Sequence, residues 1–464
     1  MNYTDPEFPV FFSIFFIIYY SCRSAGLQIA ALVLASLLFY SWNAPWLVTL
    51  LLLTWAITTI TSYAVLKMNS DSVRRRIVTF GVLLNLSILC VFKYKSLIPM
   101  QYFAGSPFSS IILLPLPIGI SFYTFHGISL LVDVYRGKAI SSHFSAATTP
   151  KKYAASSLLY LVFFPQLIAG PIVKARYFIP QIGLKRFSDI PWYMACNTLI
   201  TGFFLKMVIA DNLSAITFWI QYPYFEWKSP PELAALLYGY SFQIFADFAG
   251  YSLIAIGLAA LLGYRLPDNF NFPYSARSIS DFWRRWHISL SSWLRDYLYI
   301  PLGGNRHGTW RTNFNLMTVM VLGGLWHGAA WSFALWGLWH GIGLVLERPF
   351  LSHTNAFAAS RIGIALRIIL VFNFVTIGWL FFKLQNFSEA LLYLRTMITP
   401  NPYVTSRLTL LLIAMFGLPV IIYHVIGAKR FILSSTSSRL IKGAMLFLVV
   451  TASGPAVEFI YFQF

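Results

Sequence analysis

The residues from Ser278 to Glu347 decide the fold of this chain. Residues 278–308 read SISDFWRRWHISLSSWLRDYLYIPLGGNRHG, and residues 313–341 read NFNLMTVMVLGGLWHGAAWSFALWGLWHG. The first part mixes arginines with tryptophans, whereas the second contains no Asp, Glu, Lys or Arg. A helix at the membrane surface followed by a membrane-buried segment is the structure that this contrast predicts.

The first part has the periodicity of an amphipathic helix. Its apolar residues recur at spacings of three and four: Ile279, Phe282, Trp283, Trp286, Leu290, Trp293, Leu294, Tyr297 and Leu298. Ser278 followed by Asp281 is a capping-box pattern at the helix start. At about 100° per residue, one polar stripe remains, consisting of Arg284, His287, Ser291 and Arg295. This stripe is either a solvated basic face or part of a functional site.

The second part carries His327 within the phrase GGLWHGAAW. An ionisable side chain in the uncharged run of residues 313–346 is costly in a membrane unless it lines a cavity. We therefore interpret His327 as a site residue; the alternative is a packed histidine that hydrogen-bonds to a neighbouring helix. In one straight helix, His340 would point about 140° away from His327. A straight helix over residues 313–346 would be longer than the roughly 30 Å thickness of a bilayer core, so we expect a break near the glycines.

The composition is that of a membrane protein. The chain has 464 residues, of which 58% are hydrophobic and 11% charged, with a mean hydropathy of +0.67. Soluble domains carry about 25% charged residues. We expect an all-α polytopic protein with about eleven transmembrane helices plus re-entrant and interfacial helices, in one membrane-embedded domain over residues 1–464. The apolar stretches lie near residues 8–22, 25–42, 44–66, 77–92, 110–132, 154–173, 194–220, 232–263, 313–346, 362–383, 405–426 and 443–464.

The net charge of +19 comes from 34 basic and 15 acidic residues. The basic residues stand in short loops between apolar stretches, which indicates cytoplasmic loops in contact with anionic lipids and excludes nucleic acid as the partner. A basic cytoplasmic face also suits a donor that bears phosphate. The three cysteines are far apart in the sequence, so neither a disulfide framework nor a metal site is expected.

The basic loops also predict the orientation of the chain. Lys67 and the run Arg74–Arg76 follow the third stretch, and a last basic loop runs from Lys429 to Lys442. If both loops are cytoplasmic, the N-terminus and the C-terminus lie outside. The acidic start MNYTDPE lacks the basic residues of a signal peptide, so the first stretch is expected to be a retained helix.

Two interruptions and two polar residues stand out elsewhere. Pro165, Gly170 and Pro171 in FFPQLIAGPI predict a re-entrant or discontinuous segment. His126 is expected to be a packed histidine. Asp247 must pair, protonate or face water at membrane depth, and either Arg284 or a site histidine is a candidate partner; a structural ion pair and a catalytic role both stay open.

A glycine-flanked basic turn follows the first part of the stretch. Asn305, Arg306, His307 and Gly308 come directly after IPLGG. Backbone N–H groups and Arg306 can bind phosphate in such a turn, although a plain turn explains the same residues.

Four segments together resemble the membrane-bound O-acyltransferases. They are FFPQLIAGPI at residues 163–172, FADFAGYSLIAIG at 245–257, DFWRRWHISLSSWLRDYLYIPLGGNRHG at 281–308 and GLWHGAAWSF at 324–333. The likeness covers nearly the whole chain, down to the ending FIYFQF. It is greatest to the bacterial branch that serves alginate O-acetylation and the D-alanylation of teichoic acid.

The resemblance implies a fold and a reaction. The fold would be a ring of helices around a central tunnel, with a catalytic core over about residues 110–347. The donor would be a cytoplasmic thioester, acetyl-CoA or an acyl carrier, with no bound cofactor or metal. The acceptor would be a hydroxyl outside, often on a periplasmic acetyltransferase or a small membrane partner that modifies a polysaccharide. The catalytic positions of the family correspond to His327 and His287. The resemblance also implies a protein of the bacterial inner membrane. Further tunnel or substrate-binding candidates are Asp247, Arg284, Ser291, Arg295, Asp296, Trp326 and Arg306.

The chemistry of the residues agrees with this reaction. Acyl transfer from a thioester to a hydroxyl needs a base, and histidine titrates near neutral pH. We assign His327 as the general base, and His287 either to positioning or to polarising the thioester carbonyl. A proton-coupled transporter or flippase of an envelope precursor is the alternative, in which the histidines and Asp247 form a proton relay.

Tyr461 is the one hydroxyl in the last six residues, FIYFQF. These aromatic residues are expected to fold back into the outer opening of the central tunnel, toward His327, because they are too apolar to stay in water. Tyr461 is then either a covalent acyl relay between donor and partner or an aromatic anchor at the membrane interface.

Overall fold

The computed structural model describes residues 1–95, 116–137, 143–145, 147–168, 170–351, 360–428 and 434–460. Within these ranges every regular element is a helix, which confirms the predicted all-α class. Tyr461 and the first residues of the last basic loop lie outside the described residues.

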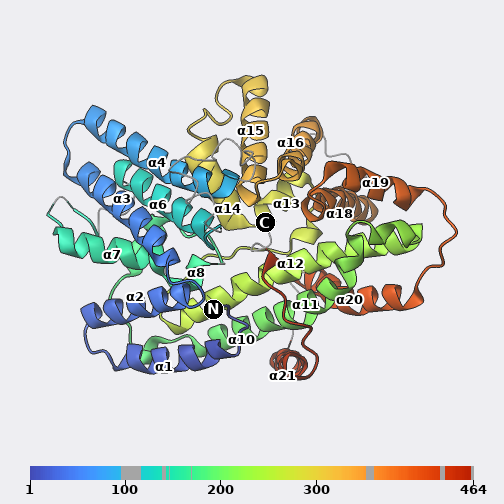
Figure 1. The fold of residues 1–464 in the computed structure, drawn as a ribbon, viewed down its shortest axis with the longest axis horizontal. Helices are drawn as coiled ribbons and strands as arrows, with labels where there is room; N and C mark the ends of the chain where they lie inside the picture. Colours follow the sequence, from blue (N-terminus) through green and yellow to red (C-terminus); the bar gives the residue numbers. More distant parts are fainter. Residues whose placement is uncertain are drawn as a thin grey trace, which may run out of the picture. The chain divides into compact units, whose positions relative to one another are not determined.

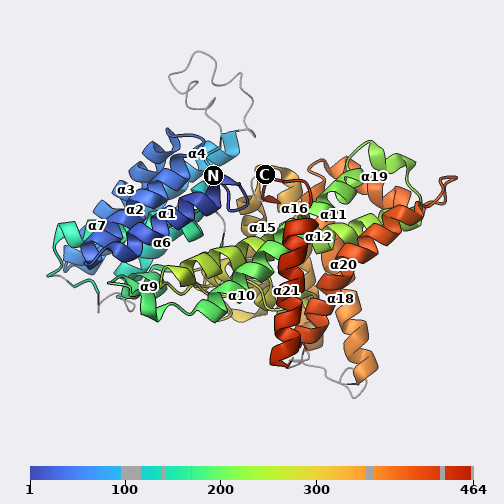
Figure 2. The same ribbon diagram turned by 90° about the horizontal axis from the view of Figure 1, so that it is seen from below.

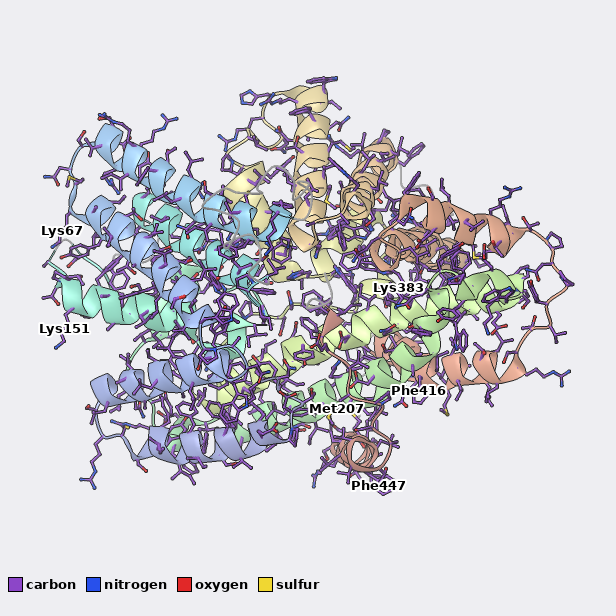
Figure 3. All side chains as sticks on the ribbon, in the orientation of Figure 1. Lys67, Lys151, Met207, Lys383, Phe416 and Phe447 are labelled. Atoms are coloured by element: carbon purple, nitrogen blue, oxygen red, sulfur yellow. The ribbon has the colours of Figure 1, made fainter. Side chains whose placement is uncertain are left out.

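Several helices are suited to a bilayer. In the described ranges, six helical segments are long and apolar enough to cross a membrane: Leu47–Lys67, Asp71–Tyr94, Trp192–Ile220, Pro230–Leu261, Arg361–Lys383 and Arg407–Gly427. Large apolar side chains such as Phe80, Leu370 and Phe447 are exposed on the protein surface, and Figure 3 shows Phe447 pointing outward from its helix. Such surfaces are stable in lipid rather than in water. The count of about eleven crossings stays a prediction.

The chain forms two compact units. Unit 1 comprises Met1–Leu199 and Ser252–Pro267, and unit 2 comprises Ile200–Tyr251 and Asp268–Phe464. Two of the three divisions fall inside helices, α10 (Trp192–Phe203) and α12 (Pro230–Leu261), and the third falls between Pro267 and Asp268.

Unit 1 is built around three packed helices, α3 (Leu47–Lys67), α4 (Asp71–Tyr94) and α6 (Ile120–Tyr135), which lie side by side in Figure 1. A Cβ atom on Gly127 of α6 would lie 2.7 Å from the Thr58 hydroxyl of α3, so glycine allows the close approach. The Thr58 hydroxyl donates to the Asn85 side chain of α4 at 3.3 Å. Small residues and hydrogen bonds of this kind hold membrane helices together.

Within the described ranges, unit 1 contains seven further complete elements, besides parts of α10 and α12. They are α1 (Glu7–Ser21), α2 (Ala25–Ser41), α7 (Pro150–Val162), α8 (Phe164–Leu167), α9 (Ala175–Phe178), η3 (Ile179–Gln181) and η4 (Phe187–Asp189). Figure 3 labels Lys67 at the end of α3 and Lys151 at the start of α7, two cations at helix ends of this unit.

The predicted discontinuous segment is present. After α7 and the four-residue α8, the chain has no regular structure from Gly170 to Lys174, yet these residues are buried. The Tyr160 hydroxyl donates to the Val173 carbonyl at 2.7 Å, and the Val173 N–H donates to Nε2 of His126 at 3.3 Å. Side chains therefore satisfy both backbone polar groups of Val173, in the way that irregular backbone inside a membrane needs. His126 is a packed histidine, as predicted.

Unit 2 contains the stretch that carries His287 and His327. Besides parts of α10 and α12, its elements are η5 (Phe204–Ala210), α11 (Asp211–Thr217), η6 (Phe218–Ile220), η7 (Tyr224–Trp227), η8 (Pro273–Ser275), α13 (Ile279–Arg285), α14 (Ile288–Leu294), η9 (Arg295–Tyr299), α15 (Gly308–His327), α16 (Trp331–Leu351), α18 (Arg361–Lys383), α19 (Phe387–Ile398), α20 (Arg407–Ala428) and α21 (Ser435–Thr451). Figure 2 shows α18, α20 and α21 from below.

A buried charge cluster holds the C-terminal segment of unit 2. The Lys206 side chain, 1% exposed, lies 2.7 Å from Asp211 and 2.9 Å from Asp247. Lys206 also donates to the carbonyl of Val457 at 2.9 Å, and Asp247 accepts from the N–H of Ile460 at 2.7 Å. The segment after α21 is thus fixed by side chains far away in the sequence.

The expectation for Asp247 is corrected by this cluster. Its carboxylate pairs with Lys206 and not with Arg284 or a site histidine. Lys206 was overlooked because it stands alone in a long apolar stretch. Gly454 completes the attachment, since a Cβ there would lie 2.5 Å from the backbone nitrogen of Asn212. Of the six residues predicted to fold back toward His327, the structure describes Phe459 and Ile460, which are buried, with Phe459 against Phe248 and Tyr251; the approach to His327 stays a prediction.

We predict that Lys206→Met destabilises the protein by about 3–5 kcal/mol, because it leaves two buried carboxylates without their cation. Asp247→Asn is expected to cost less, since the remaining Lys206–Asp211 pair is neutral. Thermal unfolding in nanodiscs measures both. Arg284→Met is the control: its contact with Asp281 is at 3.8 Å and its side chain is 69% exposed, so a change below about 1 kcal/mol is expected. Equal stability of all three variants would contradict the assignment.

Candidate active site

The predicted interfacial helix is in fact two short helices. The backbone breaks between α13 and α14 at His287, which has a left-handed conformation with φ 42° and ψ 54°. The predicted polar stripe therefore does not exist as one face: the Arg284 side chain is 69% exposed, whereas His287 is 1% exposed. The start of α13 is as predicted, because the Ser278 hydroxyl accepts from the N–H of Asp281 at 2.9 Å.

Asn269 explains the break. Its carbonyl accepts from the N–H of Ile288 at 2.9 Å. Its side-chain oxygen accepts from the Ser289 hydroxyl at 2.8 Å and lies 3.0 Å from Nδ1 of His287. N–H groups that would continue one helix thus bond to a loop instead. Periodicity within residues 278–298 carries no information about this contact, which is why the sequence prediction was wrong here.

The same contact sets the tautomer of His287. An amide oxygen only accepts, so Nδ1 of His287 carries the proton and Nε2 has the lone pair in the neutral ring. The ring edge meets Phe248 of α12, with ring centroids 4.5 Å apart. Phe248 in turn contacts Phe459 of the C-terminal segment. His287 is therefore held by Asn269 through a hydrogen bond and by Phe248 through ring packing, and Phe248 itself packs against Phe459.

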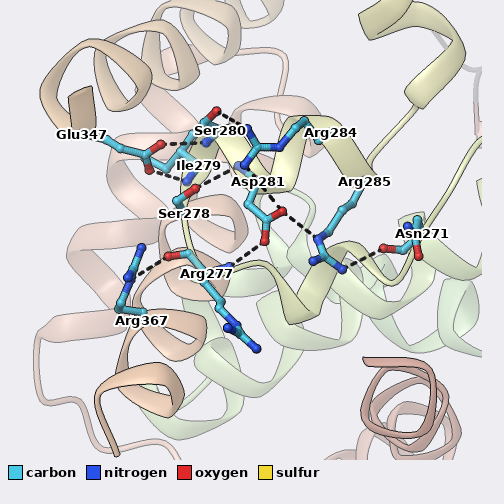
Figure 4. Close-up of polar contacts among 10 residues, drawn as sticks. All are labelled: Asn271, Arg277, Ser278, Ile279, Ser280, Asp281, Arg284, Arg285, Glu347 and Arg367. Carbon is cyan, nitrogen blue, oxygen red and sulfur yellow. Dashed lines mark hydrogen bonds and ion pairs between the residues drawn. The ribbon is translucent and has the colours of Figure 1, made fainter. Parts of the chain in front are cut away.

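The first turn of α13 is attached to α16. The carboxylate of Glu347 accepts from the backbone N–H groups of Ile279 and Ser280, the latter at 2.9 Å (Figure 4). Asp281 pairs with Arg285 at 2.9 Å on the other side of the helix. Because α13 ends at Arg285, two residues before His287, these bonds fix the start of the helix that leads to His287.

His327 is the last residue of α15. The chain leaves helical geometry at Gly328 and starts α16 at Trp331, so the predicted break near the glycines is confirmed. A Cβ on Gly324 would lie 2.1 Å from the carbonyl oxygen of Phe333, which shows that the two helices pack backbone to backbone. The His327 ring is 5% exposed and contacts the rings of Trp326, Trp336 and Phe382, with centroids 5.1–5.2 Å apart.

His327 lines a cavity of about 270 Å³ inside unit 2. Ser291 and Arg295 line the same cavity, together with Trp283, Trp336 and further apolar side chains. Asp296 binds the Arg295 side chain at 3.0 Å. The Trp326 ring contacts both His287 and His327, at 6.2 and 5.1 Å between centroids. Three of the predicted site residues, His327, Ser291 and Arg295, therefore line one apolar cavity, and Trp326 connects His327 to His287 by ring contacts.

Three candidates lie elsewhere. Asp247 belongs to the charge cluster, and Arg284 pairs with Asp281 at the surface. Arg306 is exposed in the turn before α15, where Gly303 and Gly304 have positive φ angles. His340 does not line the cavity; it is buried among Trp283, Trp336 and other rings. Asn269 is the positioning residue that the sequence did not reveal.

Comparison with known proteins identifies the class. The model of the membrane-bound O-acyltransferase family matches residues 34–388, and the chain belongs to this family. It is therefore a multi-pass membrane acyltransferase, as the motifs predicted.

Individual relatives refine the comparison. The chain is 36% identical to the probable alginate O-acetylase AlgI of Pseudomonas aeruginosa over 443 residues, which cover 92% of this chain and 81% of the relative. It is 35% identical to a peptidoglycan O-acetyltransferase of Helicobacter pylori, covering 80% and 73%. A teichoic acid D-alanyltransferase of Bacillus subtilis is 27% identical, covering 59% and 70%. The branch inferred from the motifs is confirmed.

We predict that Asn269→Ala lowers the rate of acyl transfer by about a hundredfold while substrate affinity changes little, because His287 loses its orientation. Steady-state kinetics of the purified protein separates kcat from KM. Asn269→Asp keeps an acceptor oxygen at the same place and should restore most of the rate. Full activity of the alanine variant would remove Asn269 from the account.

Proposed function

We propose that this protein is an O-acetyltransferase that moves an acetyl group from a cytoplasmic thioester across the membrane to a hydroxyl acceptor. The acetyl group then reaches a polysaccharide of the cell envelope. The single observation that carries the proposal is the His327 ring at the wall of the cavity, beside the ring of Trp326 that also contacts His287. The names of the relatives, which act on alginate and peptidoglycan, support this substrate class.

We assign the chemical step to His327. The imidazole takes the proton from the acceptor hydroxyl, whose oxygen attacks the thioester carbonyl carbon. The C–O bond forms, the C–S bond breaks, and the proton passes from His327 to the departing thiolate. A neutral imidazole in an apolar cavity suits this role, because it accepts and returns one proton.

Positioning is the role that the geometry favours for His287. With Nδ1–H donated to Asn269, Nε2 of the neutral ring accepts a hydrogen bond and does not donate one. It can orient the acceptor hydroxyl, whereas polarising the thioester carbonyl would need a protonated ring in a site that is 1% exposed. We therefore prefer the first of the two roles that the sequence left open.

The donor is proposed to be acetyl-CoA or an acyl carrier thioester. Arg295 extends from the cavity wall with its side chain 64% exposed, and Arg306 is exposed in the glycine turn. Both guanidinium groups are exposed, so they can bind the phosphate groups of the donor. We place the protein in a bacterial inner membrane with both termini outside, where a periplasmic acetyltransferase or a small membrane partner collects the acetyl group.

We predict that His327→Ala lowers the acetyl-transfer rate by roughly 10²–10⁴ without loss of folding, because the general base is gone. Transfer of labelled acetyl groups from acetyl-CoA to an acceptor by the purified protein measures the effect. His340→Phe is a matched control, since both ring nitrogens of His340 lack hydrogen bonds within the described ranges and its neighbours are aromatic. The control should keep its activity; a fully active His327→Ala variant would overturn the assignment.

Tyr461→Phe tests the two roles of the C-terminal tyrosine. If Tyr461 accepts the acetyl group and passes it on, removal of the phenol oxygen abolishes transfer while donor binding persists. If the ring is only an anchor, the phenylalanine variant transfers at the normal rate. We propose the anchor as a minimum role, because Phe459 and Ile460 just before it are already buried. Mass spectrometry of the C-terminal peptide during turnover detects an acetyl-tyrosine directly.

A further inference from the structure

We propose that a groove between α18 and α20 in unit 2 binds one anionic glycerophospholipid, with an acyl chain in the groove and the phosphate at Arg277. This inference does not depend on the proposed function. The groove has a volume of about 440 Å³, within the range of small-molecule sites. Its walls are apolar side chains of two candidate membrane spans: Ile364, Ile368 and Phe372 of α18, and Val420, Ile421 and Val425 of α20.

The groove has one basic lining residue in the described ranges, Arg277. The backbone of Arg277 is fixed on both sides, since its N–H donates to Asp281 at 3.1 Å and its carbonyl accepts from Arg367 at 3.0 Å (Figure 4). Within the part of the chain that the structure describes, the guanidinium of Arg277 makes no ion pair. It remains available for an anion from outside the protein.

The two carboxylates drawn in Figure 4 already have partners. Asp281 binds Arg285 at 2.9 Å, and Glu347 accepts from the backbone of α13. Arg277 is the one charged side chain among the described residues that line the groove. Basic pockets between membrane helices are suited to anionic lipid headgroups.

A buried histidine adds a second polar contact. His424 is 4% exposed and lines the groove. Its Nδ1 lies 2.8 Å from the Val420 carbonyl of the same helix, so Nδ1 carries the proton and Nε2 is an acceptor. Nε2 has no hydrogen-bond partner within the described ranges. A bound molecule that brings a donor to this nitrogen would satisfy it.

Phosphatidylglycerol meets all three requirements. Its acyl chain fits apolar walls, its phosphate suits Arg277, and its headgroup hydroxyls can donate to His424. Free phosphate would leave the groove empty, and a zwitterionic lipid would carry its own cation to Arg277. The lipid would also brace the residues before α13, since Arg277 stands at the entry to that helix and α13 leads to His287.

The experiment compares lipid retention by the full-length protein in nanodiscs of phosphatidylcholine with and without phosphatidylglycerol. Native mass spectrometry should detect one retained phosphatidylglycerol per chain, accompanied by a rise in Tm that inorganic phosphate does not reproduce. Arg277→Gln should weaken retention roughly fivefold, from the loss of about 1 kcal/mol for one arginine near an anionic headgroup. Ile421→Trp should abolish it by filling the groove.

Arg361→Gln is the matched control. Arg361 is exposed at the start of α18 and does not line the groove, so retention should be unchanged. Three results would overturn the proposal: retention that Arg277→Gln and Ile421→Trp both leave intact, an equal loss with Arg361→Gln, or equal retention of phosphatidylcholine. Ile421→Trp decides the matter by itself if Arg277→Gln does not fold.

Discussion

The side chain and backbone of Asn269 hold the two short helices on either side of His287 in their bent arrangement. A residue with φ 42° is strained unless it is glycine, and such strain persists only where the surroundings impose it. Here the bonds from Ile288, Ser289 and His287 to one asparagine impose it. Without them, α13 and α14 would join into one amphipathic helix, and the imidazole would turn with its neighbours toward the polar face.

Two further attachments support this arrangement from opposite directions. Glu347 of α16 caps the start of α13, and the charge cluster around Lys206 holds the C-terminal segment whose Phe459 packs against Phe248 beside His287. The Lys206 cluster is buried, so an unpaired charge there would be costly, whereas Glu347 is half-buried. Loss of Lys206 would leave two buried carboxylates without their cation.

The sequence predicted the features that depend on local order. The helix start at Ser278, the break after His327 and the irregular segment near Gly170 follow from capping, glycine and proline patterns, and all three are present. Local sequence patterns did not predict the contacts between residues that are distant along the chain. Asn269 and Lys206 have no local signal, since one stands in a loop before η8 and the other in an apolar run. The predicted single polar stripe was wrong for the same reason, because periodicity assumes an unbroken helix.

We propose that the chain makes a covalent ester from a cytoplasmic thioester rather than carrying a solute across the membrane. The most direct measurement is the fate of acetyl-labelled acetyl-CoA offered to inside-out vesicles that contain the protein. The account predicts label in ester linkage on the protein, on a co-purifying partner or on glycan in the lumen. Label that accumulates in the lumen as a free small molecule, with none in ester linkage, would contradict it.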